Sequence, residues 1–188
     1  WWDHIRIYKH NKLFGNELGF NSFARFKNNY GAQVNLRYTG KKYDYYEPRV
    51  TGRYYYEPFK FTYNIYAFSD YRKPLSVELD LSGSRLPDMD QRYNSGELYI
   101  NLRIGKRYQF YYNTEISSEV NDRGFVDMTE NEDTIYFARR NINVIESVLG
   151  SSFVVSNKAG LDLRIRHYWS GVLNKEYYHL QPDGGLVS

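Results

Sequence analysis

Residues 30–39 read Y-G-A-Q-V-N-L-R-Y-T, and their order is the strongest structural signal in the chain. Every even position carries an apolar or aromatic side chain, namely Tyr30, Ala32, Val34, Leu36 and Tyr38. Every odd position carries a side chain that is not hydrophobic. Because successive side chains of a strand point to opposite faces of a sheet, this alternation predicts a strand with one apolar and one polar face.

The same period of two recurs along the chain. It is clear in residues 59–67, 75–82, 98–104, 108–113 and 161–169, and weaker in residues 18–26. Ile142, Ile145 and Leu149 stand at helical spacing, but the β-branched residues around them favour a strand. The sequence therefore predicts an all-β, antiparallel protein with about eight strands.

Short and long connections alternate between these strands. The short ones are residues 28–29, 69–74, 105–106 and 157–158, and the long ones are residues 40–58, 83–96 and 117–133. Short periplasmic turns and long extracellular loops are typical of transmembrane β-barrels of the outer membrane. Residues 133–156 should then be one passage across the sheet. It is longer than the roughly 9–11 residues that cross a bilayer, so it should contain a bend or bulge, with residues 133–140 above the membrane or in the loop.

The composition narrows the class of protein. The chain has 188 residues, a net charge of +3, no cysteine, and an aromatic content of 19% that includes 21 Tyr. The absence of cysteine excludes disulfides, thiolate metal sites and thiol catalysis, and the balanced charge argues against a nucleic-acid partner. We expect residues 1–188 to be a single β-barrel region and a fragment of a larger barrel, with residues 1–15 as a lead-in segment.

Alternation alone also fits a soluble β-sandwich, whose apolar faces pack on each other. Two further features, besides the alternation of short and long connections, favour the membrane barrel. Aromatic residues stand near the ends of the apolar faces, as in the girdles of membrane barrels, and the polar faces carry charges that suit a wet lumen. Examples of the aromatic residues are Tyr30, Tyr38, Phe59, Tyr108 and Trp169.

Several motifs, in this order, resemble a known family. They are Y-D-Y-Y-E-P-R with G-R-Y-Y (43–55), D-Y-R-K-P-L (70–75), N-D-R-G-F-V (121–126), I-Y-F-A-R-R (135–140) and residues 160–170. Together they resemble the C-terminal outer-membrane β-barrel domain, of unknown function, that follows a family-nine-type carbohydrate-binding domain in Gram-negative proteins. The resemblance covers residues 16–185. Ala138 departs from it where we expect glycine, and the carbohydrate-binding domain and the last strands of the barrel are absent from the chain.

The resemblance implies a location in the outer membrane of a Gram-negative bacterium. Its implied partners are outer-membrane lipid and the remaining strands of the same barrel or of another chain. By alternation, the candidate lumen-lining residues are Arg37, Glu78, Asp80, Arg103, Gln109, Asp162, Arg164 and Arg166. The tyrosine-rich segment offers candidate contacts to carbohydrate or a surface protein, but we favour the alternative in which it folds over itself and plugs or roofs the barrel. These candidates are Tyr45, Tyr46, Arg49, Arg53, Tyr54 and Tyr55.

No catalytic motif is evident. The four histidines, His4, His10, His167 and His179, are not spaced as metal ligands, and the acidic segment 122–133 lacks a calcium-binding spacing. We predict no catalytic, cofactor-binding or metal-binding residues, and hence a barrel that is not an enzyme. It would act in solute passage or in surface anchoring of a carbohydrate-binding domain. The alternatives are a soluble tyrosine-rich β-sandwich that binds glycan or protein, and a barrel-embedded hydrolase.

Overall fold

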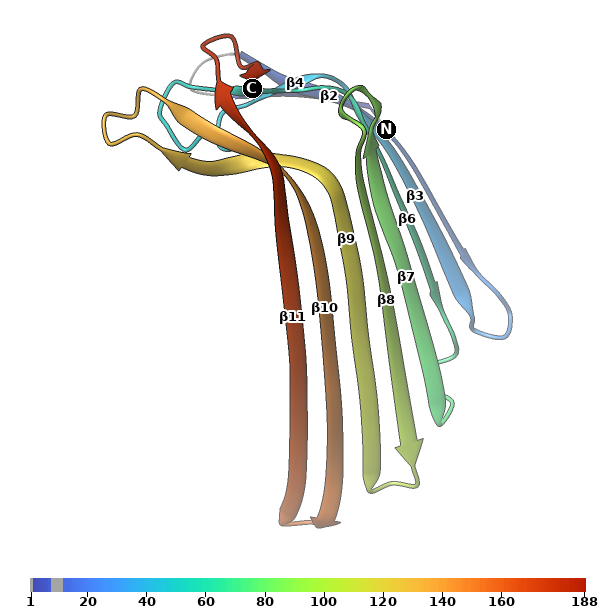
Figure 1. Ribbon diagram of the computed structural model, residues 1–188. Coiled ribbons are helices and arrows are strands. Elements are labelled where there is room, and N and C mark those ends of the chain that lie inside the picture. Colours follow the sequence, from blue (N-terminus) through green and yellow to red (C-terminus); the bar gives the residue numbers. More distant parts are fainter. Residues whose placement is uncertain (1, 8–11) are drawn as a thin grey trace.

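The chain folds as antiparallel β-structure (Figure 1). The structure is a computed structural model that describes residues 2–7 and 12–188, with side chains described from residue 15 onward. No helix in these residues is long and apolar enough to cross a membrane. The elements are β1 (Trp2–Ile7), β2 (Lys12–Arg25), β3 (Gly31–Thr39), β4 (Lys42–Asp44), β5 (Tyr55–Glu57), β6 (Lys60–Phe68), β7 (Leu75–Leu86), the 3-10 turn η1 (Pro87–Met89), β8 (Gln91–Ile104), β9 (Tyr108–Met128), β10 (Ile135–Ser156), β11 (Ala159–Leu180) and β12 (Leu186–Val187).

Ten strands form one sheet in the order β1-β2-β3-β6-β7-β8-β9-β10-β11-β12, and β4 pairs with β5 separately. Every described pairing is antiparallel, which confirms the predicted all-β class. The segment expected as a lead-in, residues 1–15, contains β1 and the start of β2; residues 1 and 8–11, and with them His10, lie outside the described residues.

The sheet is open along both sides within the described residues. On its outer side β11 pairs only through His179 and Leu180, with β12. On the other side β1 pairs with β2 only as far as Leu18, so residues 19–25 of β2 have a single neighbouring strand. The described strands therefore do not close into a barrel by themselves.

The short turns lie where they were predicted. Of the three predicted long loops, however, two are wrong, because strands occupy most of their residues. Only residues 87–90 separate β7 from β8, and only residues 129–134 separate β9 from β10. The strands continue through most of residues 83–96 and 117–133, where polar residues on both faces hide the hydrophobic period while the backbone pairing persists. The third prediction is confirmed, since residues 40–54 hold only the three-residue β4 before β5 begins.

The long passage before the last tight turn is irregular, as predicted. The register of β10 with β9 shifts between Tyr136 and Phe137 and between Arg140 and Ile142, and its register with β11 shifts between Arg139 and Arg140. Such shifts are β-bulges, which bend a strand and increase its twist. Figure 1 shows β9 and β10 turning away from the sheet near these positions. Residues 135–140 belong to β10 and not to a loop.

The register aligns the apolar positions of all eight long strands on one face. One row across the sheet runs from Phe20 through Leu36 and Tyr63, and another runs from Leu75 through Leu102, Phe110 and Ser151 to Leu163. Nothing in the described structure covers this face: Leu161 is 66% exposed, Phe20 57% and Leu79 41%. The apolar face of the sheet is therefore not the core of the described structure.

The buried core lies instead at one end of the sheet, in what we call the cap, which comprises residues 40–58, 121–140 and 176–187. Tyr55, Ile135, Phe137 and Leu180 form its centre, each at most 5% exposed. Figure 1 shows the cap at the upper end and the four tight turns at the opposite end. Partly buried residues packed around this centre are Val50, Met89, Phe125, Met128, Tyr178 and Leu186.

Aromatic rings cover glycines of neighbouring strands. Tyr63 lies over Gly83, Phe68 over Gly31 and Tyr111 over Gly150, and in each pair the two residues are register partners or close neighbours across strands. A Cβ at Gly83 would stand 2.6 Å from the Tyr63 hydroxyl oxygen. Glycine in a strand leaves space that a cross-strand aromatic ring can fill, so these pairs hold the ring flat against the sheet.

Candidate functional site

The polar face of the sheet is the first candidate surface. All eight residues predicted as lumen-lining share it, because the cross-strand register connects their positions from β3 to β11. Arg103 stands opposite Gln109, and Ser152 links Gln109 to Asp162 on the next strands. Their common face agrees with the alternation.

Asparagines join four strands on this face. Asn21 Nδ2 donates to Asn35 Oδ1, Asn35 Nδ2 donates to Asn64 Oδ1 at 3.1 Å, and Asn64 Nδ2 donates to Asp80 Oδ1 at 2.6 Å. The chain of hydrogen bonds runs from β2 through β3 and β6 to β7. The amides of Asn35 and Asn64 both accept and donate, so the ladder fixes these side chains and orients the Asp80 carboxylate.

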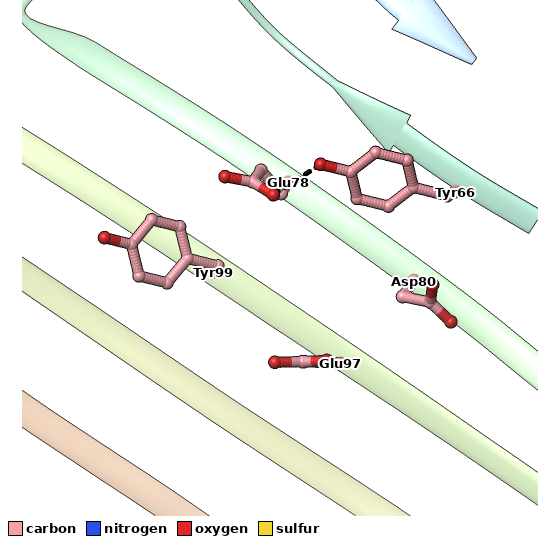
Figure 2. A pocket seen from close by; sticks show the side chains of 5 residues that line it. All are labelled: Tyr66, Glu78, Asp80, Glu97 and Tyr99. Carbon is pink, nitrogen blue, oxygen red and sulfur yellow. Dashed lines mark hydrogen bonds between the residues drawn. The ribbon is translucent and has the colours of Figure 1, made fainter. Parts of the chain in front are cut away.

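The ladder ends at a cavity of about 400 Å³ lined by Tyr66, Glu78, Asp80, Glu97 and Tyr99. Figure 2 shows the five side chains standing on the same face of β6, β7 and β8. The Tyr66 hydroxyl donates to Glu78 Oε2 at 2.5 Å, drawn as the dashed line in Figure 2. The cavity thus combines three carboxylates with two phenol rings.

A row of acidic side chains crosses the sheet through this cavity. Asp80 is the register partner of Glu97, Glu97 of Glu115, and Glu115 of Glu146. Arg166 neutralises only the last of them, with its Nε 2.8 Å from Glu146 Oε1. Like charges directly opposite one another destabilise a sheet, so this row costs stability and creates a negative potential above the polar face.

Glu97 stands in the middle of this row. Within residues 15–188 no hydrogen bond or ion pair engages its carboxylate, whereas Asn64 donates to Asp80 and Ser95 Oγ donates to Glu115 at 3.2 Å. A free carboxylate beside tyrosine hydroxyls can accept hydrogen bonds from a polar solute or attract a cation. The arrangement can therefore hold or guide polar solutes along the sheet.

The tyrosine-rich segment is the second candidate, and its residues divide between anchoring and exposure. Tyr55 is 5% exposed, with its ring centroid 5.2 Å from that of Phe137 and its hydroxyl 3.3 Å from Met89 Sδ. Tyr45 and Tyr54 contact each other at 5.5 Å between centroids. Tyr46, by contrast, is 77% exposed and is the member of this set best placed for contact with a ligand.

Both arginines of the segment bind other parts of the cap. The guanidinium of Arg49 lies 4.6 Å from the centroid of Phe125, and Arg53 Nη2 donates to the Leu180 carbonyl at 2.8 Å. Glu47 Oε1 accepts a hydrogen bond from the Phe125 backbone amide at 2.9 Å. These contacts tie the segment to β9 and β11, so most of its residues anchor it within the cap.

A charged cavity of about 440 Å³ lies between the cap and the polar face. Lys42 Nζ pairs with Glu57 Oε2 at 2.7 Å, and Arg140 Nε with Asp122 Oδ2 at 2.7 Å. Glu119 also lines the cavity, and burial together with the neighbouring Asp122 raises the pKa of its carboxyl, against the opposing effect of Arg140. Most charges in this cavity are thus matched within the protein.

The histidines with described side chains show no catalytic geometry. Within residues 15–188 no hydrogen bond joins His167 or His179 to a serine or a carboxylate. His167 stands opposite Ser147 on the apolar face, and the ring of His179 lies 5.0 Å from that of Tyr136. In the described part of the chain no group of three or more His, Asp or Glu side chains is arranged to hold a metal ion.

Sequence reasoning missed several residues of the cavity in Figure 2. Tyr66, Glu97 and Tyr99 were not among the predicted site residues, although alternation puts all three on the polar face. Their gathering depends on the register between β6, β7 and β8, which periodicity within one strand does not contain. Glu97 also borders residues 83–96, which were expected to form a loop.

Comparison with known proteins identifies the family of the chain but gives no relative of known function or structure. A search of curated proteins and a search of solved structures each found no match. A family model described as "Domain of unknown function (DUF5916)" matches residues 1–188. Since this match covers the whole chain, the protein belongs to that family of domains of unknown function.

Proposed function

We propose that the chain forms part of the wall of a transmembrane β-barrel in the outer membrane of a Gram-negative bacterium, with a polar lumen through which small polar solutes pass. The observation that carries the proposal is the continuous apolar face of eight long strands, which no other described element covers. A soluble sandwich would need a second sheet packed on this face. The second sheet here, β4 with β5, has only three residues in each strand and belongs to the cap.

The height of the apolar face fits a bilayer. On β11 the outward positions from Leu161 to Trp169 are apolar except for His167, Gly171 interrupts the run, and the exposed Leu173 follows on the same face. The nine residues from Leu161 to Trp169 match the roughly 9–11 residues with which a tilted strand crosses a bilayer. At the same upper level the outward residues of the neighbouring strands are polar, namely Asn94, Ser118 and Asn143.

Two pairs of hydroxyls inside this band are hydrogen-bonded to each other, whereas His167 on the same face has no hydrogen bond within residues 15–188. Thr114 and Ser147 face outward on adjacent strands, and their hydroxyl oxygens lie 2.9 Å apart in a hydrogen bond. Tyr108 OH accepts a hydrogen bond from Ser151 Oγ at 3.1 Å near the turn end. Hydroxyls that pair with one another lose less on transfer to lipid than hydroxyls without partners.

The open sides of the sheet support a larger assembly. Unpaired backbone groups are costly in a bilayer because no water is there to bond them. In the proposed barrel, β11 and residues 19–25 of β2 therefore pair with further strands of the same protein or of another chain. The polar face then lines the lumen, with the cap across its upper end and the acidic row below it.

A pair of identical substitutions on one strand tests the membrane placement. Ile165→Arg puts a charge in the middle of the band and should cost about 2–4 kcal/mol of insertion free energy. Leu173→Arg makes the same change on the same face of β11, but above the band, and should be tolerated. The readout is the folded fraction in outer membranes, measured by heat-dependent migration on gels. Equal effects of the two variants would count against the proposal.

A further inference from the structure

Each of the four tight turns carries an exposed basic residue at its tip. The turn after β2 holds Lys27, the turn after β6 holds Lys73, and the turn after β10 holds Lys158, while the turn after β8 holds both Lys106 and Arg107. Lys73 Nζ also lies 5.9 Å from the ring centroid of Tyr30, next to the neighbouring turn. Figure 1 shows all four turns at the end of the sheet opposite the cap.

No free acid balances these charges at the turn tips. The one carboxylate within the turns is Asp70, and Arg72 binds it with Nη2 2.9 Å from Asp70 Oδ2. This hydrogen-bonded pair lowers the pKa of the Asp70 carboxyl to about 2, so the carboxylate stays ionised and engaged with Arg72. Within residues 15–188 no ion pair reaches the five other basic residues of the turns.

The basic tips lie directly beyond the apolar band. Outward-facing Leu75 follows the turn after β6, and outward-facing Ile104 and Tyr108 flank the turn after β8. The β8–β9 turn also borders a cavity of about 130 Å³ lined by Arg103, Lys106, Arg107, Tyr108, Gln109 and Ser152. Groups at this height meet the phosphate layer of the adjacent leaflet if the band spans the hydrocarbon.

We infer that the turn end of the sheet is a binding surface for the phosphate groups of anionic phospholipids. The inference rests on the proposed membrane placement. Lysine and arginine donate charge-assisted hydrogen bonds to phosphate oxygens, and their flexible stems reach from a turn into the headgroup layer. With bases on four successive hairpins, the surface can bind several headgroups along one rim and set the depth of the barrel in the membrane.

Native mass spectrometry of the protein in neutral detergent tests this inference. The probes are phosphatidylglycerol and phosphatidylethanolamine with identical acyl chains, so only the net charge of the headgroup differs. The test variant combines Lys106→Gln, Arg107→Gln and Lys158→Gln. The matched control removes three exposed basic charges away from the turns, with Lys41→Gln, Arg92→Gln and Lys175→Gln.

The wild type and the control should prefer phosphatidylglycerol, and the turn variant should bind it about a hundredfold more weakly, as expected for the loss of three basic residues that each act on an anionic lipid surface. The inference fails if the turn variant binds as the wild type does, or if the control loses as much affinity. It also fails if a soluble polyanion such as polyglutamate binds the turn end and phosphatidylglycerol does not. A protein that stays monodisperse without detergent and binds neither lipid would instead overturn the proposed function.

Discussion

Glu119, in the charged cavity, makes the free energy of unfolding depend on pH. It is a partly buried carboxyl on β9, above the apolar band, and burial and Asp122 raise its pKa. A carboxyl whose pKa is higher in the folded state favours folding when protonated and opposes it when ionised. Its unfavourable contribution therefore grows as the pH rises from the ordinary glutamate range through the raised pKa, and it is complete above that value.

Glu119→Gln should accordingly raise the unfolding temperature at pH 8 and leave it nearly unchanged at pH 4, where the carboxyl is protonated in most molecules of both states. Thermal unfolding followed by circular dichroism at the two pH values measures this. Glu130→Gln, at an exposed residue in the turn between β9 and β10, controls for the loss of an acidic side chain in general. A variant that is less stable than the wild type at pH 8 would mean that the carboxylate makes a favourable interaction there.

The sequence predicted on which face of the sheet a residue lies wherever the alternation within its own strand determines that face. Arg37, Glu78 and Arg166 were placed on one face from parity within their own strands, and the register agrees. The position of Glu97 between Asp80 and Glu115 was not foreseeable, because it depends on two registers at once, that of β7 with β8 and that of β8 with β9. The anchoring of Arg53 to the Leu180 carbonyl joins residues 127 positions apart, which no local pattern reports.

At the scale of elements, the cap depends on contacts of the tyrosine-rich segment. Tyr55 is the part of β5 that enters the core, where it packs against Phe137 of β10. Arg53 and Glu47 add hydrogen bonds to the strands on either side. The sheet beyond the cap keeps its own backbone ladder, so we expect the cap to open separately from the sheet.

Tyr55→Ala should release the segment without unfolding the sheet. Removing a buried aromatic side chain costs about 3–5 kcal/mol, and segments with few buried contacts open locally at low free energy. The expected result is faster tryptic cleavage after Arg49 and Arg53, with unchanged heat-dependent gel migration of the undigested protein. Tyr46→Ala, at a side chain that is 77% exposed, is the control and should be cleaved as the wild type is. Equal protection of both variants would show that Tyr55 does not anchor the segment.

Element boundaries also show where sequence patterns stop being informative. Residues 83–96 looked like a loop because the apolar period ends near Leu81, yet β7 runs to Leu86 and β8 begins at Gln91. Hydrophobic alternation reports contact with an apolar medium, whereas strand pairing requires only backbone hydrogen bonds. Where a hairpin continues above the apolar band, its hydrophobic alternation therefore ends before its strand pairing does.

For the whole molecule, the central claim is that the exposed apolar face meets lipid while the polar face meets water. The open sheet, the buried cap and the acidic row are consistent with this claim. Strand β8 is the best place for a test, because both of its neighbours, β7 and β9, are described and the open edges are distant in the strand order.

The measurement is a cysteine scan of residues 98–103 in lipid bilayers, with a nitroxide label at one position at a time. The wild-type chain has no cysteine, so each label is unique. The account predicts an alternation of period two: labels at Leu98, Ile100 and Leu102 collide with oxygen dissolved in lipid, and labels at the odd positions collide with a water-soluble nickel chelate. Even positions that are shielded from both reagents, as in a packed sandwich, or open to the chelate would contradict it.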